Sequence, residues 1–270
     1  MSEDKANNCY RGRIAPTPSG FLHIGHIFTF RKAWERARQA KGKLVLRMDD
    51  LDCDRCTPRF SDACIEDING MGINWDEGPD IGGDFGPYSQ GMRSELYLSV
   101  LTKLLELKLI YPCVKSRKEI CTAGLMDSRG EEYLYPQHFR PQNIHCKNNE
   151  FPGAVNWRFA TQWEEKVSFI DKKMGKMDFK VGKEFSDFLV WRKDGFAAYE
   201  LASVVDDSLM KITEVVRGED LLISSARQCL LFDALGWKRP DFFHCRIVLG
   251  ADGKKLSKST RTLPRLFSSS

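Results

Sequence analysis

The sequence lacks any apolar run long enough to cross a membrane, because its longest apolar stretches fall well short of the ~18 residues that a spanning helix needs. The opening residues MSEDKANNCY contain no basic patch followed by an apolar stretch, so they do not resemble a secretory signal. There is no internal repeat, and the one low-complexity run is Ser268–Ser270. These absences exclude membrane-spanning and repeat proteins, and we expect a soluble, cytoplasmic protein with no membrane partner.

Strong charge of either sign is also missing. The 270 residues carry 41 Lys plus Arg against 37 Asp plus Glu, a net charge of +4. This balance permits contact with nucleic acid but does not indicate a dedicated basic surface. Hydrophobic residues make up 42% and charged residues 29%, which is typical of a globular chain with one large domain or two modest ones.

Paired metal-binding motifs are absent, although the chain holds nine cysteines. Without a secretory signal, reduced thiols are expected rather than a disulfide framework. Only Cys53 and Cys56 form a CxxC motif, and no second CxxC follows at a suitable distance. We interpret these two as incidental thiols in a polar loop.

Alternating strand and helix patterns fill most of the chain. The pattern predicts an α/β fold with a doubly wound parallel sheet. A polar, proline-containing stretch over 111–150 interrupts the alternation, and we expect an insertion there. The expected strands are 11–15, 43–48, 156–160, 166–170, 187–191, 212–217 and 242–249, and the expected helices are 22–39, 60–71, 93–109, 198–205 and 224–235.

The motif LHIGH at residues 22–26 follows the first expected strand and a proline-glycine turn. His23 and His26 lie three residues apart, on one face of the first helical turn. A helix N-terminus favours phosphate, and Gly25 lacks a side chain, so a flat base could approach the backbone. Taken alone, the motif could equally be two histidines that cap a surface helix.

A second motif, KLSKS at residues 255–259, lies in a glycine-rich basic loop after the last expected strand. Lys255 and Lys258 could reach phosphate oxygens and neutralise a leaving pyrophosphate. Alone it would read as an ordinary solvated loop. HIGH followed by KxSKS is the paired signature of class I aminoacyl-tRNA synthetases, and the chain resembles them in both motifs and in their order.

The resemblance is closer to the glutamyl-tRNA synthetases and runs from about residue 10 to 259. RIAPTPSGFLHIGH at 13–26 is similar to their pattern RxAPSPTGxLHIGH, and RMDDLD at 47–52 to their RIEDTD. Further similar segments are YELASVVDD at 199–207, ITEVVRGEDL at 212–221 and GW at 236–237. Within this group, DFLVWRKDG at 187–195 and YSQ at 88–90 resemble the short paralogous family of glutamyl-queuosine tRNA(Asp) synthetases.

That resemblance implies a class I Rossmann-like catalytic domain with an inserted subdomain and without an anticodon-binding domain. We expect residues 9–110 to form its first half, 111–180 the inserted subdomain equivalent to the acceptor or zinc region, and 181–249 its second half. Residues 250–270 would form the KLSKS loop and a short C-terminal tail.

The resemblance also implies an activity: ATP-dependent activation of glutamate to glutamyl-adenylate, and transfer to the queuosine base of tRNA(Asp) by a monomer. Three alternatives stay open. One is a truncated glutamyl-tRNA synthetase that charges tRNA(Glu), another is a non-catalytic synthetase-like tRNA-binding protein, and the third is a small-molecule adenylyltransferase of the same superfamily.

The site residues implied by the family fall into two groups. His23, His26, Lys255 and Lys258 would be catalytic and bind the ATP triphosphate with Mg²⁺, together with Gly25 and Ser257. For glutamate, Arg13 and Arg217 would bind the carboxylates, Tyr199 would add a hydroxyl, and Thr17 with Asp49 would meet the ammonium.

The chain departs from the family pattern at three places. Asp49 stands where the family has Glu, and Ser203 stands at a pocket position that differs between the two synthetase groups. The paralogues bind zinc through C-x-C followed by Y-x3-C. Here Cys113 and Tyr135 match, but Lys115 and Phe139 replace the other two ligands. Cys121, His138 and Cys146 do not keep the spacing, so we do not expect a complete zinc site.

Overall fold

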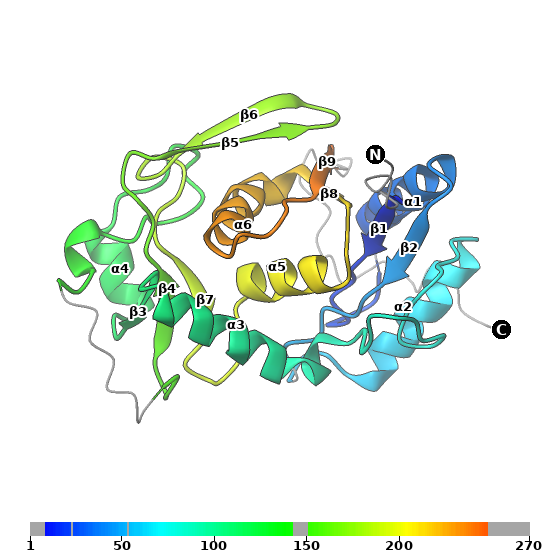
Figure 1. Ribbon diagram of the computed structural model, residues 1–270, viewed down its shortest axis with the longest axis horizontal. Coiled ribbons are helices and arrows are strands. Elements are labelled where there is room, and N and C mark those ends of the chain that lie inside the picture. The colour runs from blue at the N-terminus through cyan, green and yellow to red at the C-terminus, as the bar shows by residue number, and fades with distance from the viewer. Residues whose placement is uncertain (1–8, 23, 53, 143–150, 248–270) are drawn as a thin grey trace, which may run out of the picture. The chain divides into compact units, whose positions relative to one another are not determined.

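The structure is a computed structural model that describes residues 9–22, 24–52, 54–142 and 151–247. Its first part is built on parallel strands. β1 (Arg11–Ile14) leads through α1 (Ile24–Gln39) to β2 (Lys43–Leu46), and the two strands pair in parallel (Figure 1). β8 (Glu214–Gly218) and β9 (Asp241–Cys245) form a second parallel pair. The Thr213 amide donates to the Arg11 carbonyl at 2.9 Å, which places β8 alongside β1.

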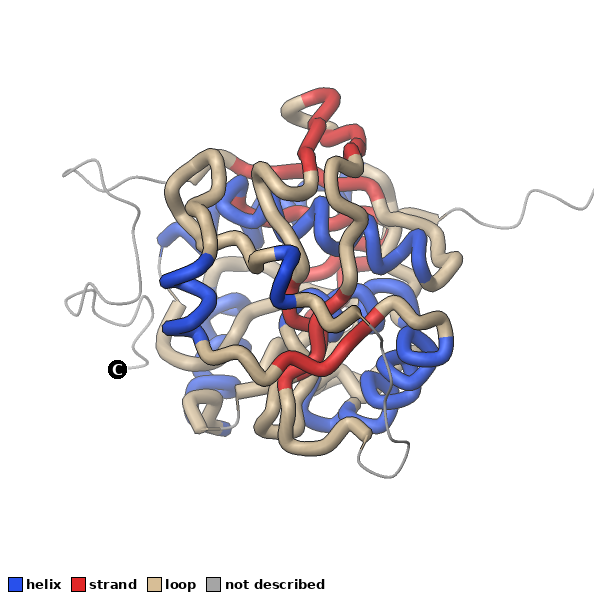
Figure 2. The backbone as a smooth tube through the Cα atoms, turned by 90° about the vertical axis from the view of Figure 1, so that its left-hand side faces the viewer, coloured by secondary structure: helices blue, strands red, loops and turns tan. Residues whose placement is uncertain are grey.

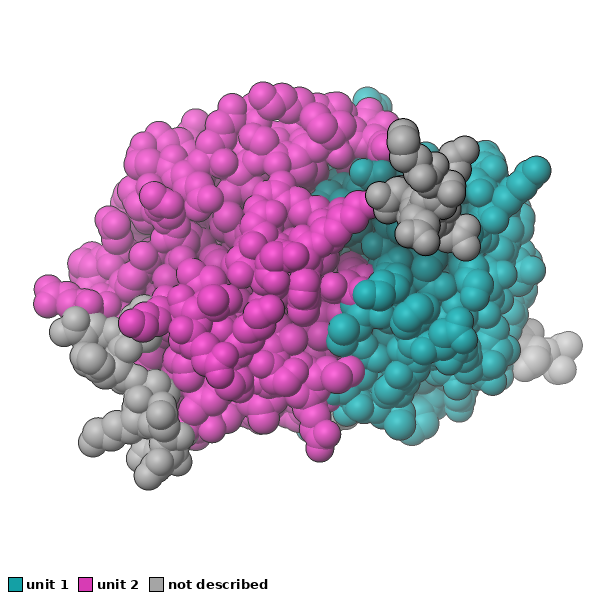
Figure 3. Space-filling view, in the orientation of Figure 1, with its two compact units in different colours: residues 1–93, 209–221, 240–270 teal, residues 94–208, 222–239 magenta. Residues whose placement is uncertain are grey.

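The chain divides into two compact units, shown in separate colours in Figure 3. The first contains residues 1–93, 209–221 and 240–270, and the second contains residues 94–208 and 222–239. The parallel strands of the first unit, joined through helices, confirm the expected α/β class. The expected division into four consecutive segments stays a prediction.

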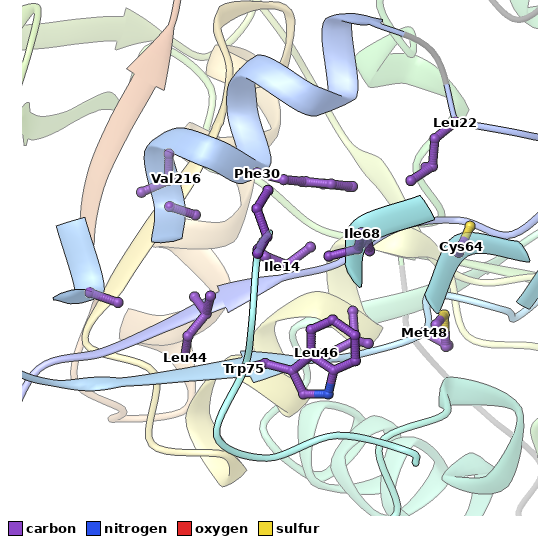
Figure 4. Packing of buried hydrophobic residues seen from close by; sticks show 13 residues of the cluster. Ile14, Leu22, Phe30, Leu44, Leu46, Met48, Cys64, Ile68, Trp75 and Val216 are labelled. Atoms are coloured by element: carbon purple, nitrogen blue, oxygen red, sulfur yellow. The ribbon is translucent and has the colours of Figure 1, made fainter. Parts of the chain in front are cut away.

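The core of the first unit lies where α1 packs against β1, β2 and β8 (Figure 4). Phe30, Ala33 and Ala37 follow helical spacing and are all buried, so one face of α1 covers the strands. α2 (Pro58–Gly70) adds Cys64 and Ile68 to the same cluster. Buried strand and loop residues complete it: Ile14, Leu22, Leu44, Leu46, Met48, Ile73, Trp75 and Val216.

A buried ion pair ties β1 to the segment that follows α2. Arg11 Nη1 and Nη2 donate to Glu77 Oε1 and Oε2 at 2.8 and 3.0 Å. The Tyr88 hydroxyl donates to Oε2 at 2.6 Å and Lys43 Nζ to Oε1 at 3.1 Å. These hydrogen bonds, of which the one from Arg11 has the largest effect, lower the pKa of Glu77 to about 2. Burial and the Glu77 hydrogen bond raise the pKa of Tyr88 to about 12.

The second unit combines helices with an antiparallel sheet in the order β3-β4-β7. Loops and turns take up much of the path of the chain (Figure 2). β5 and β6 pair antiparallel as a hairpin (Figure 1). The elements are α3 (Ser94–Glu106), β3 (Ile110–Cys113), α4 (Arg117–Ala123), β4 (Asn156–Phe159), β5 (Lys166–Asp171), β6 (Gly175–Lys180), β7 (Phe188–Trp191), α5 (Tyr199–Leu209) and α6 (Leu222–Ala234).

Asp187, just before β7, gathers the inserted segment around one buried carboxylate. It accepts hydrogen bonds from the Tyr111 hydroxyl at 2.5 Å, Arg140 Nε at 2.9 Å, and the Thr161 amide and hydroxyl at 2.9 and 2.7 Å. A single buried acid therefore links β3 to the segments on both sides of β4 and to the start of β7. These donors satisfy a carboxylate that would be costly to bury without partners.

The stretch 111–150, expected as an insertion in which no element was predicted, begins with regular structure. β3 covers 110–113 and α4 covers 117–123. Ser116 caps α4, since its hydroxyl accepts from the Glu119 amide at 3.2 Å while the Glu119 carboxylate accepts from the Ser116 amide at 2.8 Å. α5 also runs beyond the expected 205 to Leu209, because Asp206, which looks like a polar end, is buried and accepts from Tyr97.

Candidate active site

The N-terminus of α1 lies after the carboxyl end of β1, the edge where open α/β sheets bind ligands. α1 begins at Ile24, so Gly25 occupies its first turn. The half-buried His26 ring stacks on Phe30 with centroids 5.9 Å apart. His23, Lys255, Ser257 and Lys258 lie outside the described residues, so the expected phosphate contacts of the two motifs stay a prediction.

Asp49 follows β2 and is locked in place by backbone and side-chain hydrogen bonds. Its amide donates to the Pro16 carbonyl at 2.9 Å, which joins the end of β2 to the loop after β1 that carries the exposed Thr17. Its carboxylate accepts from Arg47 Nε at 2.7 Å, and Arg47 is fully buried. The structure thus brings Asp49 beside the loop that carries Thr17, and their expected contact with an ammonium group stays a prediction.

Arg47 contacts a predicted site residue and was not itself among the residues that the sequence predicted for the site. It lies two positions before Asp49 and contacts it from inside the core. The ion pair with Arg47 holds the Asp49 carboxylate in one orientation, which favours a defined ammonium contact. The sequence did contain a sign of this role, because Arg47 directly follows the apolar residues of β2. A charged residue at such a buried position usually has a partner of opposite charge.

The acidic run after β2 also has a structural part. Asp50 accepts from the Gly91 amide at 2.8 Å and from the Ser89 hydroxyl. The Met48 amide donates to the Tyr88 carbonyl at 2.8 Å, so the YSQ segment runs alongside the end of β2. Asp50 therefore positions this segment, while Asp49 is left as the candidate ligand.

Arg13 and Arg217 lie on neighbouring parallel strands, β1 and β8, and are only 5% and 4% exposed. Arg13 Nη1 donates to the Val216 carbonyl at 3.1 Å, which connects the two strands at the position before Arg217. The Arg217 guanidinium stacks over the Phe242 ring of β9 at 5.4 Å. Two guanidinium groups held this way are suited to a ligand with two carboxylates.

Tyr199 is the predicted glutamate-site residue that belongs to the second unit. It begins α5 and is 38% exposed. Ser203 lies one helical turn later and is buried, and its hydroxyl has no hydrogen-bond partner among the described residues. A buried hydroxyl of this kind is costly unless something satisfies it, so Ser203 is a candidate contact for a polar ligand.

The residues at the expected zinc positions do not fit a zinc ion. Cys113 and Tyr135 are in contact, with the thiol 3.5 Å from the hydroxyl, but the other two positions hold Lys115 and Phe139. Within the described residues, no three His, Cys, Asp or Glu side chains gather to hold a metal ion. An ammonium and a phenyl ring cannot replace thiolate ligands.

Comparison with known proteins places the chain in a family. Residues 10–267 match the model of the tRNA synthetases class I (E and Q), catalytic domain. A relative named "Glutamyl-Q tRNA(Asp) synthetase" from Symbiobacterium thermophilum is 41% identical over 257 residues, covering 92% of this chain and 77% of that protein. A protein of the same name from Nitratidesulfovibrio vulgaris is 40% identical over 256 residues, covering 94% and 79%.

Solved structures agree with this assignment. The glutamate tRNA ligase from Elizabethkingia meningosepticum, crystallised with its amino acid, superposes with a TM-score of 0.78 at 29% identity. The match covers 93% of this chain and 52% of that structure, so the chain spans about half of it. In the described part of the chain, no helix is both long and apolar enough to cross a membrane. The chain therefore belongs to the family of class I tRNA synthetases (E and Q) and carries its catalytic domain.

Proposed function

We propose that the protein activates L-glutamate with ATP and transfers the glutamyl group to the queuosine base of tRNA(Asp). As a class I synthetase it is a ligase that uses ATP. The observation that carries the choice of glutamate is the pair Arg13 and Arg217, which are buried on neighbouring strands and whose guanidinium groups suit the two carboxylates of this amino acid. The choice of acceptor rests on the two relatives named glutamyl-Q tRNA(Asp) synthetase.

In the first step, an oxygen of the glutamate α-carboxylate attacks the α-phosphorus of ATP. The new P–O bond forms as the bond to pyrophosphate breaks, giving glutamyl-adenylate. No protein nucleophile is needed, so the residues contribute positioning and charge stabilisation. His23, His26, Lys255, Ser257 and Lys258 are proposed to hold the triphosphate, and Gly25 to make room for adenine.

The glutamate pocket is proposed to combine two cations, one anion and hydroxyl donors. Arg13 and Arg217 would take the carboxylates and Tyr199 would donate a hydrogen bond. Asp49, oriented by Arg47, would accept from the ammonium together with Thr17. Since the ligands for a dedicated metal cage do not gather in the described residues, Mg²⁺ is proposed to arrive on the ATP phosphates.

In the second step, a hydroxyl of the queuosine base attacks the carbonyl of the adenylate. An ester forms and AMP leaves. This stage distinguishes the proposal from a shortened glutamyl-tRNA synthetase, which would place the ester on the 3′ end of tRNA(Glu).

Two assays test the proposal. We expect ATP–pyrophosphate exchange that depends on glutamate, is not supported by aspartate or glutamine, and proceeds without tRNA. An exchange rate that does not respond to glutamate would contradict the activation step and favour a non-catalytic tRNA-binding protein.

The acceptor is tested with radiolabelled glutamate. We expect labelling of native queuosine-containing tRNA(Asp) and none of an unmodified tRNA(Asp) transcript. Labelling of unmodified tRNA(Glu) would instead identify the shortened glutamyl-tRNA synthetase.

A further inference from the structure

The inserted segment holds a cluster of four side chains at the positions where the related synthetases bind zinc. We call Cys113, Lys115, Tyr135 and Phe139 the clasp. Cys113 ends β3, and Phe139 ends a short 3-10 helix at Gln137–Phe139. The four residues come from two separate stretches of the second unit, 113–115 and 135–139. The contacts among them therefore hold these two stretches of the insertion together.

The two residues that match the zinc pattern bind each other. The Cys113 thiol donates to the Tyr135 hydroxyl at 3.5 Å, and that hydroxyl donates to the Phe139 carbonyl at 3.2 Å. Both side chains are therefore engaged as hydrogen-bond donors inside the cluster.

The two residues that depart from the zinc pattern also bind each other. The Lys115 ammonium lies 4.7 Å from the centre of the Phe139 ring, a cation–π contact. Lys115 Nζ is also 3.2 Å from Glu119 Oε1 on α4. The Phe139 ring packs edge-on against Tyr135 with centroids 5.9 Å apart, so the two pairs form one cluster.

The charge around the clasp opposes a metal dication. Besides Lys115, the Arg158 guanidinium of β4 lies 4.3 Å from the centre of the Tyr135 ring. Apolar packing closes the remaining space, since buried Tyr111 and Ile120 belong to the same hydrophobic cluster. The groups that fill the place of a metal are therefore a thiol and a phenol that hydrogen-bond to each other, a cation and an aromatic ring.

The geometry points to a metal-independent clasp: the Cys113–Tyr135 hydrogen bond and the Lys115–Phe139 cation–π contact together replace a zinc ion in holding the end of β3 against residues 135–139. The inference is independent of the acceptor proposed above, because it concerns how the insertion is held and not what the site reacts with.

Metal analysis of the purified full chain tests the clasp directly. We expect less than about 0.1 zinc per chain after expression in zinc-supplemented medium. The melting temperature should change by less than about 1 °C with excess 1,10-phenanthroline. One tightly bound zinc per chain, or a chelator-induced loss of stability, would overturn the inference. That result would bring in Cys121, His138 or Cys146 as ligands, of which Cys146 lies outside the described residues.

A gain-of-binding variant supplies the second arm. The double substitution Lys115→Cys and Phe139→Cys recreates the family pattern, so we expect about one zinc per chain and a chelator-sensitive melting temperature. Cobalt substitution should give the absorption bands of a tetrahedral thiolate site. Adding Cys113→Ser should remove both. If the double variant binds no zinc although its circular dichroism is that of the parent, the four positions do not form one site and the inference fails.

Discussion

Arg13 and Arg217 are buried, with 5% and 4% of their surface exposed to solvent, unlike the surface arginines of this protein. A guanidinium is seldom buried without a specific task, because removing it from water is costly. Their placement on neighbouring strands could be expected from the sequence only through the family resemblance. The strand order that joins residues 13 and 217 is not visible in periodicity.

Substitution of Arg217 by Lys should therefore impair glutamate binding selectively. Lysine keeps the charge but loses the planar fork, so we expect KM for glutamate to rise about 10- to 100-fold, with KM for ATP within about twofold. Pyrophosphate exchange at varied glutamate measures this. Arg192→Lys, at an exposed ion pair with Asp194, is the control. An unchanged KM for glutamate would remove Arg217 from the pocket.

The partners of Asp49 and Asp50 could not be predicted from the sequence. The acidic run 49–52 marks a site by its resemblance, but the division of labour inside it depends on burial. Asp49 is gripped by a core arginine, while Asp50 binds Ser89 and Gly91. Neighbouring residues with the same charge thus have different tasks, which no pattern of residue types separates.

Glu77 gives a pH dependence that can be measured. Its pKa is lowered to about 2 in the folded state, so the stability it contributes is fully present above the unfolded value near 4.5 and is lost as pH falls through about 2. We expect the free energy of unfolding in urea to drop by up to about 3 kcal/mol over this window. In Glu77→Gln this part of the drop should disappear.

Asp84→Asn is the matched control for Glu77, because it also neutralises an acid beside Lys43, but at an exposed site. It should leave the acid-induced loss of stability unchanged. Equal pH profiles for the parent and Glu77→Gln would show that the Arg11–Glu77 pair does not set the acid limit.

At the level of elements, the sequence predicted those whose apolar spacing is strong and missed those that rely on other interactions. α1 and α3 have apolar faces, α6 is buried almost all round, and all three appear where expected. β6 exposes most of its residues, with Phe179 its one buried side chain, so it gives no alternating pattern. β3 and α4 lie in a polar segment that composition alone marked as irregular.

The capping box of α4 makes this element testable. Ser116→Ala removes the hydroxyl that accepts from the Glu119 amide, and we expect a loss of about 1 kcal/mol in unfolding free energy. Urea unfolding followed by fluorescence measures it. Ser99→Ala, an exposed serine in the interior of α3, should change the stability by less than about 0.5 kcal/mol.

At the level of the whole molecule, the family resemblance includes two motifs that lie far apart in the sequence, HIGH at 23–26 and KLSKS at 255–259. The KLSKS motif lies outside the described residues, so its role is tested by substitution. We expect Lys258→Ala to lower kcat for pyrophosphate exchange about 100- to 1000-fold with little change in KM for glutamate, since the lost charge acts on the leaving group. Lys238→Ala, at an exposed position, serves as the control. A wild-type kcat in Lys258→Ala would show that the motif is not part of the catalytic machinery.

The contact between β1 and β8 has a consequence for how the protein is made. The Arg11 amide donates to the hydroxyl of Thr213, which lies 202 positions later in the sequence. At about 5–20 residues per second, a ribosome needs roughly 10–40 s to deliver Thr213 after Arg11 has been added. Throughout that interval the nascent chain must carry an open edge on its first strand. The contact that brings Arg13 and Arg217 onto neighbouring strands therefore forms only late in synthesis.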